Sequence, residues 1–109
     1  MILEPAPLPG VFVVRPEKLA DPRGFFARLW CEDTFLAAGV SFRPRQISTS
    51  CNRTAGTLRG LHWQAAPHGE TKLVRAERGR IFDVAVDLRP DSATFRRWFG
   101  IELDAGAHT

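Results

Sequence analysis

Residues 79–88 have the sequence GRIFDVAVDL, a nearly continuous apolar run that two aspartates interrupt. A short apolar run that begins at a glycine and is followed by Pro90 is typical of a largely buried β-strand. We therefore expect a strand here, with Ile81, Val84 and Val86 contributing to the core.

The same rhythm continues along the rest of the chain. Eight prolines and nine glycines separate short stretches rich in valine, isoleucine and aromatic residues, which predicts an all-β protein. The expected strands are residues 11–15, 25–30, 45–52, 57–64, 71–77, 79–88 and 97–103. Residues 32–38 should form one short helix that Asp33 or Thr34 caps and Gly39 ends. Antiparallel pairing of the last four strands would give a double-sheet jelly roll or cupin-like barrel.

The chain has 109 residues, enough for a single cupin-like domain over residues 1–109. A jelly roll that stops shortly after the strand at 97–103 would leave sheet edges open and part of its core uncovered. We therefore expect the domain to be incomplete at its C-terminus, completed either by a partner chain or within a longer protein. A homodimer is expected, with residues 11–15 as a strand that two chains could exchange.

Composition argues against several classes of protein. The net charge is +3, but the fifteen lysines and arginines are dispersed and form no basic run, so nucleic-acid binding is not expected. The N-terminus does not resemble a signal peptide and no stretch is long enough to span a membrane, which favours the cytoplasm. Cys31 and Cys51 lack a CxxC spacing and are expected to be buried free thiols.

Residues 56–64, GTLRGLHWQ, carry the most informative chemistry. In a strand, Gly60 and His62 would share one face, with Arg59 on the other, and Gly60 would leave room for a ligand. From spacing alone, His62 is either a catalytic base or an ordinary structural histidine. Other candidate residues also have a purely structural interpretation: Lys72 could lie on a solvated strand face, and residues 21–24 could be only a turn.

A metal cofactor is not expected, because the histidines form no His-x-His pair and have no carboxylate at ligand spacing. They are His62, His68 and His108. Asp83 and Asp87 are expected to be structural and to pair with arginines.

Five segments then occur in a fixed order: DPRGFF (21–26), QISTSCN (46–52), GTLRGLHWQ (56–64), KLVR (72–75) and DVAVDLR (83–89). Together they resemble the dTDP-4-dehydrorhamnose 3,5-epimerase family over residues 11–103. The resemblance implies a metal-free jelly-roll homodimer that needs no cofactor. Its substrate would be a nucleoside-diphospho-4-keto-6-deoxyhexose, inverted at C3, C5 or both.

The resemblance also implies the catalytic residues. His62 matches the family's proton acceptor, and Lys72 matches a lysine near the keto oxygen of the sugar. The chemistry agrees, because a neutral imidazole is a suitable base near pH 7 and an ammonium stabilises the enolate that forms.

For the nucleotide, Arg23 and Arg59 match arginines that contact phosphate, and Gln46 falls in the family's Gln-x-Asn segment. Arginine suits a diphosphate because its planar fork donates two hydrogen bonds at once. Ser48, also assigned to substrate binding, stands where the family usually has Asn. Arg28 stands where the family usually has Glu.

In the family, a tyrosine returns the proton and an aspartate orients the histidine, both in the C-terminal half. This chain contains no tyrosine. Two hypotheses therefore stay open: an isomerase of which this is the N-terminal portion, or a non-catalytic cupin module or inactive fragment that binds sugar nucleotides.

Overall fold

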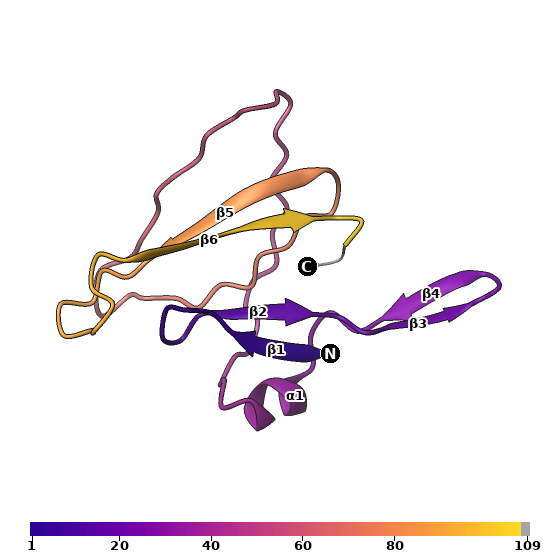
Figure 1. Cartoon of the computed structure of the whole chain (residues 1–109), viewed down its shortest axis with the longest axis horizontal. Coiled ribbons are helices and arrows are strands. Elements are labelled where there is room, and N and C mark those ends of the chain that lie inside the picture. Colours follow the sequence, from indigo (N-terminus) through magenta and orange to yellow (C-terminus); the bar gives the residue numbers. More distant parts are fainter. Residues whose placement is uncertain (108–109) are drawn as a thin grey trace.

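Residues 1–107 are described by the computed structural model shown in Figure 1. They form mostly strands and one short helix. In chain order the elements are β1 (Ile2–Pro5), β2 (Phe12–Arg15), β3 (Lys18–Asp21), β4 (Gly24–Ala27), α1 (Glu32–Ala37), β5 (Arg80–Val86) and β6 (Trp98–Asp104). The predicted all-β class with one short helix is confirmed. The strands predicted at 11–15, 25–30, 79–88 and 97–103 and the helix at 32–38 are present with shifted ends.

The strands pair as three antiparallel hairpins: β1 with β2, β3 with β4, and β5 with β6. In the long β5–β6 hairpin, Val84 lies opposite Gly100 and Val86 lies opposite Trp98. Strands β1 and β3 were not predicted from the sequence. Each forms because a turn brings it back against a neighbour that is only a few residues away.

The core is small. Its buried apolar residues are Leu8, Phe35, Ala76 and Leu103. The prediction that Ile81, Val84 and Val86 are core residues holds only in part, because all three are half-buried. Phe82 and Trp98 lie on the same face of hairpin β5–β6 as Val84 and Val86, and among residues 1–107 they stay 66% and 64% exposed.

A buried carboxylate organises the connection between β5 and β6. The Asp87 side chain is 1% exposed and accepts hydrogen bonds from Arg89 Nε (2.8 Å), Ser92 Oγ (2.5 Å) and Thr94 Oγ1 (2.6 Å). Arg89 Nη2 also donates to the carbonyl of Pro9 at 2.9 Å, which ties this connection to the β1–β2 turn. The predicted structural role of Asp87 is confirmed, whereas Asp83 is exposed.

Helix α1 is held by one buried side chain, Phe35, whose ring centroid lies 5.7 Å from that of Phe42. Its N-cap is Cys31, without a side-chain cap hydrogen bond, so the prediction of Asp33 or Thr34 as the cap is wrong. Its end is as predicted, since Gly39 follows the last turn at φ +76°.

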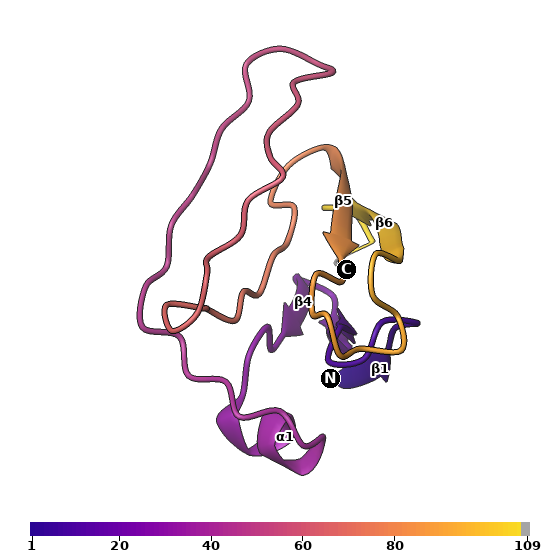
Figure 2. The ribbon, with the colours of Figure 1, turned by 90° about the vertical axis from the view of Figure 1, so that its left-hand side faces the viewer.

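Residues 43–75, called here the open segment, run as a long excursion from the body of the molecule (Figures 1 and 2). Every residue in it is exposed, including Ile47 at 92% and Leu58 at 90%. The strands predicted at 45–52, 57–64 and 71–77 are therefore wrong for this structure. A strand needs a neighbour for its backbone groups, and no part of residues 1–107 pairs with this segment.

The two cysteines are free thiols, but the prediction that both are buried is wrong. Cys51 is exposed because it lies in the open segment, and Cys31 is half-buried beside the helix. The nearby backbone N–H of Thr34, in the first turn of α1, lowers the pKa of the Cys31 thiol.

Candidate functional site

His62 lies exposed in the middle of the open segment. Its imidazole is folded back toward Gly60, where an added Cβ would lie 3.4 Å from His62 Nδ1. Gly60 has a φ of +107°, a conformation that favours glycine. The room that Gly60 was predicted to leave for a ligand therefore lies next to the His62 ring. Because residues 57–64 are not a strand, the expected separation of Arg59 and His62 onto opposite faces does not apply.

The open segment turns at residues 53–58, and the stretches before and after this turn are called here its two arms. The Arg59 guanidinium, on the second arm, is held by residues 51 and 52 of the first. Its Nε donates to Asn52 Oδ1 at 2.6 Å, and its Nη2 donates to the Cys51 carbonyl at 3.2 Å. Between the two arms, Thr57 Oγ1 donates to the Thr54 carbonyl at 2.7 Å. Asn52 is the contact that sequence reasoning missed, although it lies at the end of the quoted segment 46–52.

Lys72 is also exposed, and its Nζ lies 3.0 Å from Glu70 Oε1. The two side chains are 54% and 50% exposed, so water screens this ion pair. Among residues 1–107, no hydrogen bond or ion pair joins Lys72 to His62 or Arg59. The residues predicted to act together thus share one segment but make separate contacts.

Arg23 lies at the tip of the β3–β4 hairpin. Asp21 Oδ1 accepts a hydrogen bond from the Arg23 backbone N–H at 2.8 Å, and Asp21 Oδ2 accepts one from Arg23 Nη2 at 2.6 Å. The Arg23 side chain beside Asp21 lowers the pKa of that carboxyl, and Asp21 raises the pKa of Arg23. The predicted turn at residues 21–24 is confirmed, and its conformation is fixed by this pair.

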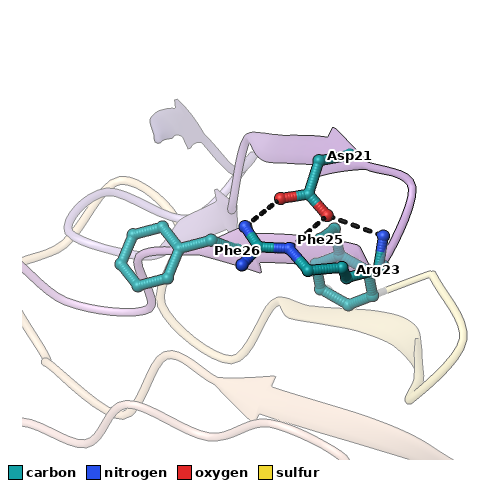
Figure 3. A pocket seen from close by; sticks show the side chains of 5 residues that line it. Asp21, Arg23, Phe25 and Phe26 are labelled. Carbon is teal, nitrogen blue, oxygen red and sulfur yellow. Dashed lines mark hydrogen bonds and ion pairs between the residues drawn. The ribbon is translucent and has the colours of Figure 1, made fainter.

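A shallow pocket surrounds the pair, lined by Asp21, Arg23, Gly24, Phe25 and Phe26. Figure 3 shows the rings of Phe25 and Phe26 on either side of the Arg23 guanidinium. Both phenylalanines are at least half exposed, and Lys18 Nζ lies over the Phe25 ring, 5.0 Å from its centroid, so the tip combines aromatic rings with cations. Such a surface suits a planar base joined to phosphate, since rings stack on the base and arginine binds the anion.

Gln46 and Ser48 lie exposed in the open segment, and Arg28 is exposed beyond β4. Over residues 1–107, no group of three His, Cys, Asp or Glu side chains is arranged to hold a metal ion. His108, weighed above as a metal ligand, lies outside the described residues. In the same part of the chain, no helix has the length and apolar character needed to cross a membrane.

Comparison with known proteins gives one family. The family model described as dTDP-4-dehydrorhamnose 3,5-epimerase matches residues 5–109. A dTDP-4-dehydrorhamnose 3,5-epimerase of Shigella flexneri is 42% identical over 101 residues, which are 90% of this chain and 54% of that protein. A dTDP-4-dehydrorhamnose 3-epimerase of Streptomyces niveus is 41% identical over 95% of this chain and 50% of its own length. The chain thus spans about half the length of these curated relatives.

Solved structures agree with the sequence relatives. A Bacillus anthracis dTDP-4-dehydrorhamnose 3,5-epimerase with TDP and PPi bound superposes with a TM-score of 0.93 at 36% identity, covering 98% of this chain and 61% of that one. A Mycobacterium tuberculosis epimerase superposes with a TM-score of 0.91 at 37% identity over 99% of this chain and 54% of its own. These matches confirm the predicted cupin-like fold class. Because nearly all of this chain superposes, the open segment follows the path that it has in the relatives.

Proposed function

Because the chain belongs to the dTDP-4-dehydrorhamnose 3,5-epimerase family, we propose that it supplies one wall of a sugar-nucleotide epimerase site. The reaction is inversion at C3, C5 or both in a nucleoside-diphospho-4-keto-6-deoxyhexose, in a deoxysugar pathway like that of dTDP-L-rhamnose. The observation that carries this proposal is the superposition, at a TM-score of 0.93, on a relative that has TDP and PPi bound.

In this proposal His62 removes the proton next to the C4 ketone. A carbon acid beside a carbonyl loses its proton readily only when the enolate oxygen is stabilised, and the Lys72 ammonium has that role. Lys72 would exchange its exposed Glu70 partner for the developing oxyanion, a change that costs little because water already screens the pair. His62 is accessible to substrate, since it lies exposed in the open segment.

The nucleotide would be held by Arg23 and Arg59, with Gln46 and Ser48 toward the base. Arg23 lines one shallow pocket with Phe25 and Phe26 at the hairpin tip, which supports a role near the base and its phosphate. The guanidinium of Arg59 is exposed, which supports a role in binding the diphosphate.

Solvent-deuterium incorporation into the 4-keto sugar nucleotide tests the assignment of His62, with the protein as its gene encodes it. His62→Asn should abolish incorporation while TDP still binds, because the amide keeps the size and polarity but removes the base. His68→Asn is the matched control, since His68 is also exposed in the open segment and has no assigned role. Incorporation that persists in His62→Asn would contradict the assignment.

The same deuterium experiment distinguishes a 3,5-epimerase from a 3-epimerase. Curated relatives of nearly equal identity include a 3,5-epimerase and a 3-epimerase. Proton NMR of the recovered sugar shows whether deuterium enters at C3 alone or also at C5.

A second candidate is a module that binds a sugar nucleotide without turning it over. The observation that favours it is that Lys72 pairs with Glu70 and, among residues 1–107, makes no hydrogen bond or ion pair with His62. TDP binding without any deuterium incorporation would support this candidate over the enzyme.

We also propose a cytoplasmic homodimer. Apolar side chains of the first two hairpins are exposed, Ile2 at 53% and Leu19 at 69%, and a second chain would remove them from water. Strand β2 is the candidate for exchange between chains, because among residues 1–107 only β1 pairs with it. A light-scattering mass of one chain at high concentration would contradict this proposal.

A further inference from the structure

Arg23 and Arg59, the two arginines assigned to phosphate, both use the guanidinium edge formed by Nε and Nη2, but their partners differ in charge. Arg23 directs Nε and Nη2 at the Asp21 carboxylate, at 3.4 and 2.6 Å. Arg59 directs Nε and Nη2 at two neutral acceptors, the Asn52 side-chain oxygen and the Cys51 carbonyl, at 2.6 and 3.2 Å. Arg23 therefore forms an ion pair, which water screens because its side chain is 89% exposed, whereas Arg59 has only neutral partners.

We propose that Asn52 is a positioning residue that orients Arg59 and keeps its charge free for the diphosphate of the substrate. This inference rests on the proposed function, because it assigns a partner to the phosphate-binding arginine of that site.

Hydrogen-bond geometry supports this role. A guanidinium has five N–H donors in one plane. Asn52 and the Cys51 carbonyl occupy the edge formed by Nε and Nη2, so the edge formed by Nη1 and Nη2 is left for a ligand. That edge can donate two parallel hydrogen bonds to one phosphate group. Because the guanidinium is planar, an acceptor bound at the Nε–Nη2 edge also fixes the direction of the Nη1–Nη2 edge.

The turn that joins the two arms has its own fixed conformation. The hydrogen bond from Thr57 Oγ1 to the Thr54 carbonyl closes it, and Gly56 lies in it at φ +75°, where a side chain is strained. The arms are thereby held at the spacing that lets Asn52 reach Arg59. A neutral amide also suits this position better than a carboxylate, because a carboxylate of the same shape would compete with phosphate for the Arg59 guanidinium.

The test uses TDP and inorganic pyrophosphate as probes, with binding followed by calorimetry. Asn52→Asp should weaken the binding of both about tenfold, since a compensated arginine donates hydrogen bonds nearer in strength to neutral ones. Ser50→Asp is the matched control: it adds the same charge at an exposed position two residues away, where no hydrogen bond to Arg59 exists. Its effect should be at most about twofold and should fade with added salt.

A spectroscopic measurement separates positioning from a general structural effect. The Nε–Hε resonance of Arg59 in a ¹⁵N-labelled sample reports the hydrogen bond to Asn52 directly. It should move in Asn52→Ala and stay in place in Ser50→Asp, and Asn52→Ala should also weaken pyrophosphate binding.

Each outcome bears on one of the two claims. If Arg59→Ala leaves TDP binding unchanged, the assignment of Arg59 in the proposed function fails. If Arg59→Ala abolishes binding but Asn52→Asp behaves like Ser50→Asp, the proposed function stands and the role of Asn52 is refuted. Loss of binding in Asn52→Asp with an unmoved Arg59 resonance in Asn52→Ala would also refute it.

Discussion

Replacing Phe35 with alanine should unfold α1 while leaving the hairpins in place. The helix has six residues, too few to be stable alone in water, so its helicity depends on the burial of this side chain. Phe35 is 4% exposed and its ring lies 5.7 Å from that of Phe42. Loss of a buried phenylalanine costs about 3 to 5 kcal/mol, and the small size of this cluster favours the lower end.

The assay is amide hydrogen exchange at Gly39 and Val40, whose N–H groups donate to the carbonyls of Leu36 and Phe35 at 2.9 and 2.8 Å. A loss of about 3 kcal/mol predicts exchange roughly a hundredfold faster at both amides. Leu36→Ala is the control, because Leu36 lies in the same helix but is 51% exposed. Exchange in Phe35→Ala within about threefold of that in Leu36→Ala would refute the reasoning.

Two further predictions concern the site and the β5–β6 connection. Gly60→Ala should slow deuterium incorporation while sparing TDP binding. The added methyl group would be strained at φ +107° and would lie 3.4 Å from His62 Nδ1. Unchanged incorporation would contradict this prediction. Hydrogen bonds from Arg89, then Ser92 and Thr94, hold the pKa of Asp87 far below its usual range. The stability that this carboxylate contributes should be complete above about pH 4 and decline as the pH falls toward its folded-state pKa. The protection factor of the Arg96 amide, in which the pH dependence of intrinsic exchange is corrected for, should follow that decline and become independent of pH over this range in Asp87→Asn.

The elements that sequence patterns predicted correctly are those with local partners. Strand β5 is evident because its apolar run pairs with β6 within the same hairpin, and Gly39 marks the helix end through its own backbone preference. Strand β3 was missed because its sequence, KLAD, has low strand propensity. It is a strand because the Asp21–Arg23 turn returns β4 against it.

The failures in the open segment have a different physical origin. Residues 57–64 have a strand-like pattern and follow the path of the relatives, yet a strand also requires a partner that the sequence of the segment does not contain. The candidate site was predicted by resemblance, which proposes Arg59 and Arg23 but not the different partners that they have in the structure. Nothing in the spacing of Asn52 and Arg59 indicates a contact, because it depends on the turn at residues 53–58.

The exposure of the open segment has a consequence for how residues 1–107 behave in solution. Within these residues its backbone groups have no strand partner, and Ile47 and Leu58 are 92% and 90% exposed. Unpaired backbone groups beside exposed apolar side chains are a template for pairing with a strand of another molecule. Residues 1–107 by themselves should therefore aggregate more readily as their concentration rises.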